Sequence, residues 1–158
     1  VLQQYATPAE LKAKPANLFT GTFIGEPPMN VFDASVAADA KTVTFTTDGG
    51  AKLAFAASEF SGNLLKLLTA RNRITLGIRP YALHVGDGPI TGKVISCQWL
   101  GDQTHVAVDV GGRTIVSVAH ERISRKPGSD LALTVDAANL HIFDSDSQTA
   151  LAHGGALA

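Results

Sequence analysis

The chain has 158 residues, 45% of them hydrophobic. A chain of this length buries roughly 70% of the surface that it exposes when unfolded, which is enough for one well-cored domain or two small interlocked ones. Its 13 lysines and arginines nearly balance its 14 aspartates and glutamates, so it has no basic field to attract nucleic acid or an anionic bilayer. Cys97 is the only cysteine, which excludes an internal disulfide, and no apolar run reaches the roughly 18 to 20 residues of a membrane span. We therefore expect a soluble protein in which Cys97 is a buried, inert thiol.

The first thirty residues predict two short helices. A capping box, Thr7-Pro8-Ala9-Glu10, starts a helix that Pro15 stops, since proline cannot continue the hydrogen-bond ladder. Pro15 also opens a second short helix over 17–23, which Gly25 and the prolines after it close. We interpret residues 1–30 as a helical seam, by which we mean a short helical segment at a junction between two parts of a protein.

From residue 31 onward, apolar and polar residues alternate in the manner typical of strands. Glycine pairs predict tight hairpin turns at 48–50 and 111–112, and Gly86-Asp87-Gly88 is expected to precede a new strand. The predicted strands are 31–36, 42–46, 52–55, 74–78, 93–99, 104–110, 114–119, 131–135 and 140–143.

Three other segments carry different patterns. Residues 58–69 place apolar side chains at helical spacing, which favours a helix, although a loop followed by a strand also fits. Residues 136–139 fit one turn of helix between two strands. Residues 150–158 are small and lack a periodic apolar face, so we expect a flexible tail there.

Three motifs along the chain resemble one known family. They are the series from Leu2-Gln3-Gln4 to Pro28-Met29-Asn30, then Leu76-Gly77-Ile78-Arg79-Pro80, then Gly92-Lys93-Val94 with Leu100-Gly101-Asp102-Gln103-Thr104. Together they resemble the region after the nucleotide-binding domain in ATP-binding subunits of sugar-type ABC importers, the maltose and glycerol-3-phosphate class. Two positions depart from that family: Tyr81 replaces its usual Glu, and Asp102 stands where Glu is frequent.

This resemblance implies a mainly β fold, made of small OB-type (TOBE) β-barrels with interleaved strands plus the short N-terminal helices. It assigns residues 31–149 to one TOBE/OB-type regulatory domain and residues 150–158 to the tail. Because strands from distant parts of the chain share sheets in this family, Gly86 is not expected to be a domain boundary.

The resemblance also implies a noncatalytic, C-terminal regulatory and dimerisation domain rather than an enzyme. ATP and Mg²⁺ would be bound by the N-terminal part of the parent subunit, and no cofactor is expected here because the motif G-x-x-x-x-G-K-[ST] is absent from this sequence. The implied partners are a second copy through this domain, the permease subunits that the parent contacts, and a regulatory protein or small effector. The implied location is cytoplasmic, at the inner face of the cell membrane without insertion into it.

Three residues are candidates for a regulatory or contact surface: Arg79, Tyr81 and Asp102. Arg79 between a strand and a proline fits either a structural clamp on a carboxylate or carbonyls, or a surface contact. Asp102 fits either a turn with local capping or a loop that holds a small anion or effector. No catalytic or metal site is predicted, because the five histidines lack ligand spacing.

An OB-type barrel fold also suggests two other functions. OB-type barrels bind single-stranded nucleic acid through aromatic platforms in a basic groove, but here the charge is balanced and Trp99 is expected in the core. A stand-alone sensor of an oxyanion or sugar phosphate is the alternative function.

Overall fold

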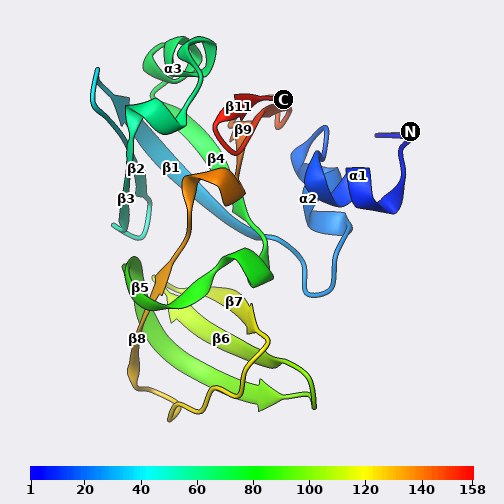
Figure 1. Cartoon of the computed structure of the whole chain (residues 1–158), viewed down its shortest axis with the longest axis vertical. Helices are drawn as coiled ribbons and strands as arrows, with labels where there is room; N and C mark the ends of the chain where they lie inside the picture. The colour runs from blue at the N-terminus through cyan, green and yellow to red at the C-terminus, as the bar shows by residue number, and fades with distance from the viewer.

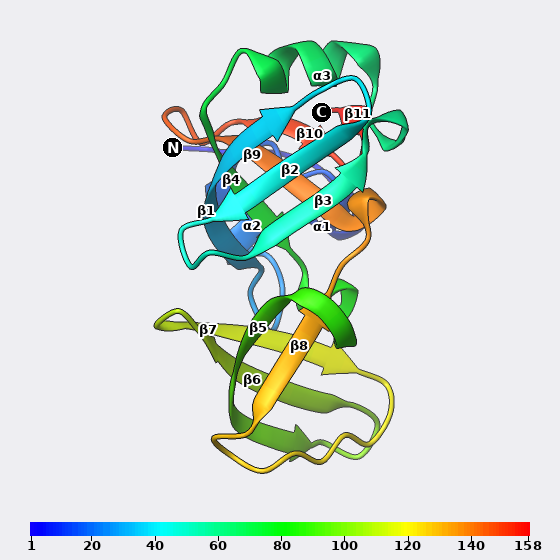
Figure 2. The same ribbon diagram turned by 90° about the vertical axis from the view of Figure 1, so that its left-hand side faces the viewer.

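The alternating pattern produces eleven strands, which form two antiparallel sheets in two stacked lobes (Figures 1 and 2). The computed structural model describes all 158 residues. The larger lobe holds the first sheet and carries the N-terminal helices on one side, and the smaller lobe holds the second sheet. The two chain termini both lie at the larger lobe.

The helices are α1 (Pro8–Ala13), α2 (Leu18–Phe23) and α3 (Gly62–Thr69), and the 3-10 turns are η1 (Ala57–Glu59), η2 (Pro80–Ala82) and η3 (Ala137–Asn139). The strands are β1 (Asn30–Ala38), β2 (Thr42–Thr47), β3 (Lys52–Ala56), β4 (Arg73–Ile78), β5 (His84–Trp99), β6 (Thr104–Val110), β7 (Arg113–Ala119), β8 (Asp130–Thr134), β9 (Leu140–Asp144), β10 (Ala150–His153) and β11 (Ala156–Leu157).

The chain passes between the lobes twice. The first sheet has the order β11-β10-β9-β4-β1-β2-β3, and the second has the order β7-β6-β5-β8. After β4 the chain builds the whole second sheet and then returns as β9, which pairs with β4 so that Leu76 lies opposite Ile142. The predicted mainly β fold with interleaved strands is therefore confirmed.

One continuous apolar core connects the lobes. Phe45, Phe55 and Phe60 pack with ring centroids 6.2–6.3 Å apart in the larger lobe, and Val106 and Val108 fill the smaller one. Each fully buried side chain of this size contributes about 1.5–3 kcal/mol of hydrophobic free energy. Leu83, Ile90, Leu133 and Leu140, where the chain passes between the sheets, join the two halves of the core.

The predicted helices are present. Thr7 and Glu10 form the capping box of α1, and the side chain of Asn17 caps α2, so Asn17 rather than Pro15 sets the start of that helix. The pattern in 58–69 resolves as η1 followed by α3, whose Leu64 and Leu68 are completely buried four residues apart.

Two predictions about the strands are wrong. Gly86-Asp87-Gly88 does not precede a strand but lies inside β5, where the register with β8 shifts between Val85 and Ile90. A Cβ at Gly88 would lie 2.1 Å from the carbonyl oxygen of Leu133, so glycine is needed there for the close approach of two backbones.

The predicted flexible tail at 150–158 does not fit the structure either. The segment forms β10 and β11 at the edge of the first sheet, and the Gly155 carbonyl accepts a hydrogen bond from the Ser61 amide at 2.8 Å. Small side chains gave no periodic signal in the sequence, yet they allow this segment to pack closely: Ala152 is completely buried.

We predict that Gly155→Ala destabilises the protein by about 1–3 kcal/mol or detaches β10 and β11, because the added Cβ would lie 1.7 Å from the Glu59 carbonyl oxygen. Urea unfolding followed by circular dichroism measures the free energy. The matched control is Gly62→Ala, whose Cβ meets no atom within 4 Å and which should stabilise by about 0.4–1 kcal/mol. Equal midpoints for Gly155→Ala and the wild type would show that the segment is not packed as described.

Candidate functional site

Arg79 is buried where the helical segment meets the first sheet. Only 3% of the residue is exposed, and its guanidinium donates to the carbonyl oxygens of Gly21 at 2.8 Å, Lys12 at 3.0 Å and Ile24. These carbonyls lie at or near the C-terminal ends of α1 and α2, where the helix dipole favours a cation. Arg79 therefore clamps both short helices onto the sheet through their backbones.

No carboxylate balances this buried charge. None of the four ion pairs in the structure includes Arg79, and its Nε is the one buried side-chain nitrogen or oxygen without a hydrogen-bond partner. Burial lowers the pKa of Arg79 from its usual value. The sequence left open whether Arg79 clamps a carboxylate or carbonyls, or makes a surface contact. The structure shows the clamp on carbonyls, and a surface contact by Arg79 remains a prediction.

The other two candidate residues lie in different surroundings. Tyr81, in η2, is 55% exposed and lines the same pocket as Arg79. Asp102 is exposed in the turn between β5 and β6, in the smaller lobe, next to Gly101 at φ +102°. That turn is closed by the backbone hydrogen bond from Leu100 to Gln103 at 2.8 Å, and the Asp102 side chain makes no hydrogen bond. The structure therefore brings together Arg79 and Tyr81 but not Asp102.

The pocket beside Arg79 has a volume of about 320 Å³ and is bordered by α1, η2, η3, β9 and the end of β10. Its charged and titratable residues are Lys12, Lys14, Arg79, Tyr81, His141 and His153. No aspartate or glutamate lines it. No local pattern in the sequence predicts this pocket, because its basic residues come from four separate segments and no local spacing connects them.

Two histidines meet in this pocket. The Nδ1 atoms of His141 and His153 are 2.9 Å apart, so one ring donates its proton to the other. Burial lowers the pKa of His141 to about 4, helped by the charges of His153 and Arg79, and burial also lowers the pKa of His153, helped by Lys14. Both rings are therefore neutral at pH 7.

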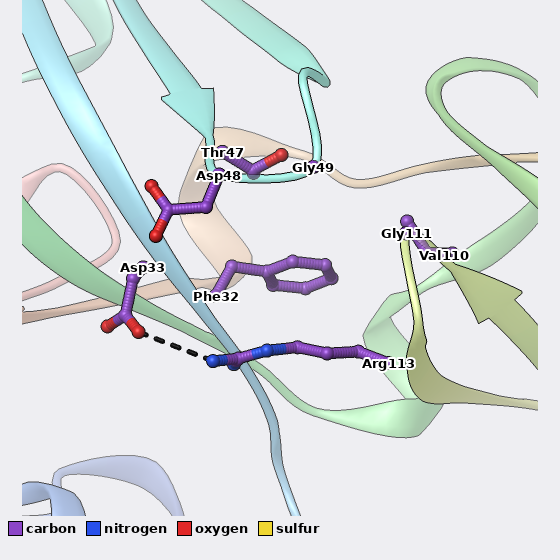
Figure 3. Close-up of a pocket in the computed structure, with 8 residues that line it drawn as sticks. All are labelled: Phe32, Asp33, Thr47, Asp48, Gly49, Val110, Gly111 and Arg113. Atoms are coloured by element: carbon purple, nitrogen blue, oxygen red, sulfur yellow. Dashed lines mark hydrogen bonds and ion pairs between the residues drawn. The ribbon is translucent and has the colours of Figure 1, made fainter.

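A second pocket, of about 130 Å³, lies between the lobes (Figure 3). Its eight lining residues are Phe32, Asp33, Thr47, Asp48, Gly49, Val110, Gly111 and Arg113. Arg113 pairs with Asp33 at 3.3 Å, and Asp48 pairs with Arg73 at 2.9 Å. Because its charges are matched and its volume is below the ~300 Å³ of ordinary ligand sites, it is a joint rather than a binding site.

Side chains bonded to backbone hold this joint. Asn30, at the start of β1, donates to the carbonyl of Val116 and accepts from its amide, both at 2.8 Å, as a neighbouring strand would. Arg113 donates to the Val31 carbonyl at 2.8 Å, and Ser117 donates to the Leu83 carbonyl. The two lobes are thus fixed by specific hydrogen bonds as well as by their shared core.

Large apolar side chains are exposed in two places. Phe19 and Phe23 stack with ring centroids 5.4 Å apart on the helical segment, and both are exposed. In the smaller lobe, Trp99 is 40% exposed, and its neighbour Leu100 is exposed as well. The expectation that Trp99 lies in the core is wrong, because it ends β5 at the open turn rather than on the inner face of the sheet.

The remaining expectations concern single residues. Cys97 is half-buried against the core rather than fully buried. His120 and Glu121 are exposed just beyond the end of β7. No three His, Cys, Asp or Glu side chains gather as metal ligands would, and no helix has the length and apolar character to cross a bilayer.

Two family models match the chain. The MalK OB fold domain matches residues 25–83, and the TOBE domain matches residues 76–143. Their overlap covers the end of β4 and the passage into the second sheet, including Arg79.

Three curated relatives match nearly the whole chain. An ABC transporter ATP-binding protein of Sinorhizobium fredii, y4oS, is 35% identical over 96% of this chain and 38% of its own length. The sn-glycerol-3-phosphate import ATP-binding protein UgpC of a Ruegeria species is 34% identical over 90% of this chain and 37% of its own. The multiple sugar-binding transport ATP-binding protein MsmK of Streptococcus mutans is 29% identical over 95% and 41%. The chain thus spans about two fifths of the length of these relatives.

A solved structure supports the fold. The cytoplasmic molybdate-binding protein ModG superposes with a TM-score of 0.57 at 19% identity, over 72% of this chain and 94% of that one. At this identity the similarity concerns the arrangement of strands alone.

We predict that Arg79→Lys destabilises the protein by about 1–3 kcal/mol, because an ammonium cannot reach three carbonyls with the fixed fork of a guanidinium. The helical segment should loosen first, so trypsin should cleave after Lys12 faster than in the wild type. Arg122→Lys, at an exposed position without hydrogen bonds, is the control. Unchanged cleavage and stability in Arg79→Lys would contradict the clamp.

A pH dependence follows from His141. The imidazole of His141 takes up a proton near pH 6.5 in the unfolded chain but only near pH 4 in the folded one. The contribution of neutral His141 to the free energy of unfolding is therefore complete above pH 6.5 and is lost as the pH falls toward 4. We expect His141→Gln to lose about 1–3 kcal/mol less than the wild type between pH 7 and 4.5 in urea unfolding. The exposed His120→Gln should follow the wild type. A wild-type slope in His141→Gln would refute this assignment.

Proposed function

We propose that this chain, which belongs to the TOBE and MalK OB-fold family found in ATP-binding proteins of sugar-type ABC importers, regulates such an ATP-binding subunit. We also propose that it holds two of these subunits together as a dimer. The parent subunit would take part in importing sugars or glycerol-3-phosphate-like solutes. Its ATP and Mg²⁺ would be held outside this chain, which has no phosphate-binding loop of the required sequence. The subunit would work in the cytoplasm, at the inner face of the membrane, against the permease subunits.

The observation that carries the dimerisation proposal is the exposed apolar end of β5. Ile95, Trp99 and Leu100 lie within six residues and are 45%, 40% and 54% exposed. Tryptophan is enriched among the residues that contribute most to protein interfaces, because its large rigid ring loses little entropy on binding. A second copy that covers this end would bury all three side chains.

The helical segment offers a separate apolar surface. A groove of about 240 Å³ is lined mainly by apolar residues of α1, α2 and the first residues of the chain, and its lining includes the stacked rings of Phe19 and Phe23. We assign this groove to contacts with the rest of the parent subunit. The two exposed surfaces would then serve different contacts, one within a subunit and one between subunits.

Regulation would depend on a difference between an effector's affinities for two arrangements of the dimer. An effector or regulatory protein that binds one arrangement more tightly shifts the population toward it by that difference alone. The rigid joint between the lobes supports this proposal, because it lets a contact on the smaller lobe move the larger lobe with it.

Sedimentation velocity over a range from about 1 to 200 μM tests the dimer. We expect the chain to self-associate, and we expect Trp99→Ala to weaken the association at least tenfold, as loss of an anchor of about 1.4 kcal/mol or more does. Tyr5→Ala removes an exposed aromatic side chain from the helical segment and serves as the matched control.

A wild-type chain that stays monomeric throughout this range would remove dimerisation from the proposal. Equal association of Trp99→Ala and the wild type would instead refute the assignment of the interface to the end of β5. The alternative function, a sensor of an oxyanion or sugar phosphate, is favoured by the basic pocket beside Arg79 and would gain support from a monomer.

A further inference from the structure

The pocket beside Arg79 concentrates positive charge without any acidic side chain. Lys12 and Lys14 come from the end of α1, Arg79 and Tyr81 from η2 and the residue before it, His141 from β9 and His153 from β10. Elsewhere on the molecule, Arg113 at the joint and Arg71 and Arg73 at the start of β4 are paired with carboxylates. None of the ion pairs in the structure includes a residue of this pocket, so no carboxylate pairs with its cationic side chains.

Arg79 gives a second, independent sign of a missing anion. Its side chain is almost completely buried, its three partners are neutral carbonyls, and its Nε has no partner. Burying an unpaired cation is costly, and an anion nearby would offset that cost. An oxyanion in the pocket would supply the charge that the carbonyls lack.

The histidine pair can respond to such an anion. With the two Nδ1 atoms sharing one proton, the donor ring keeps a free Nε2 lone pair, while the acceptor ring carries its own proton on Nε2. The donor ring can therefore take up one further proton when a negative charge offsets Arg79 and the lysines. Arg79 works against protonation of His141, and Lys14 works against protonation of His153.

We infer that this pocket binds a small tetrahedral oxyanion of the phosphate type, and that binding is accompanied by uptake of a proton by the His141–His153 pair. The volume of about 320 Å³ lies at the small end of ligand sites, which suits inorganic phosphate or a short phosphate monoester and excludes a polymer. The inference does not rest on the proposed function, because binding is a property of this chain alone. The pocket would then be the binding site of the small effector in the proposed function.

Isothermal titration calorimetry of the full chain with inorganic phosphate tests this inference, at pH 6.5 and pH 8 and at constant ionic strength. We expect sub-millimolar affinity. In a parallel titration with sulfate, whose charge is the same at both pH values, binding should be about threefold to tenfold tighter at pH 6.5, since raising one imidazole pKa by a unit adds up to a factor of ten. Repeating the sulfate titration in two buffers of different ionisation enthalpy should show net proton uptake, which only the protein can then account for. Absence of heat at both pH values would overturn the inference.

Variants locate the site. Lys14→Gln should weaken phosphate binding about tenfold or more, as the loss of a charge-assisted hydrogen bond does. His153→Gln should abolish the pH dependence of sulfate binding. Lys126→Gln removes an exposed lysine from the smaller lobe and should leave the affinity unchanged. Phosphate binding that survives both pocket variants, or that Lys126→Gln weakens equally, would show that the phosphate lies elsewhere and would overturn the assignment.

A parallel titration with glycerol 3-phosphate distinguishes the source of the phosphate group. Tighter binding of the monoester assigns the pocket to an organic phosphate, and tighter binding of inorganic phosphate assigns it to the free ion; both outcomes support the site. A failure of these phosphate titrations would not affect the conclusion on dimerisation from sedimentation. Each of the two proposals can therefore be refuted without the other.

Discussion

The guanidinium of Arg79 lies where three parts of the molecule meet: the end of α1, the end of α2, and the passage from β4 to the smaller lobe. The helices are six residues each, far too short to be stable alone, and neither buries a long apolar face. Their position therefore depends on a polar interaction, in which one side chain satisfies carbonyls that the helix ends leave free. The basic pocket exists because this clamp brings α1 against β9 and β10.

The lobes depend on one another in a similar way. The shared core runs through both, and Asn30 extends the backbone hydrogen bonding of β7 across the joint. The matched charges of Arg113 and Asp33 border the same joint. Such a connection resists bending. A contact made on one lobe therefore rotates both lobes together and does not change their arrangement relative to each other.

The elements with a strong local signal were predictable from the sequence. A capping box predicted α1, the helical spacing of apolar residues favoured α3, and the alternation of apolar and polar residues predicted the central strands. The failures have a common cause in small residues: Gly88 permits a close backbone approach inside β5, and Ala152 packs without a periodic pattern. Of the candidate residues, Arg79 and Tyr81 came from a motif. The histidine pair could not be found, because His141 and His153 meet only after β9 and β10 have paired.

The return of the chain from the smaller lobe has a consequence for biosynthesis. Strand β4 pairs with β1 on one side and with β9 on the other, and β9 begins only at Leu140. On the ribosome, β4 therefore keeps one edge open while the entire smaller lobe is being made. An open strand edge is a template for pairing with another chain. During synthesis the larger lobe would need protection from such pairing until the last strands emerge.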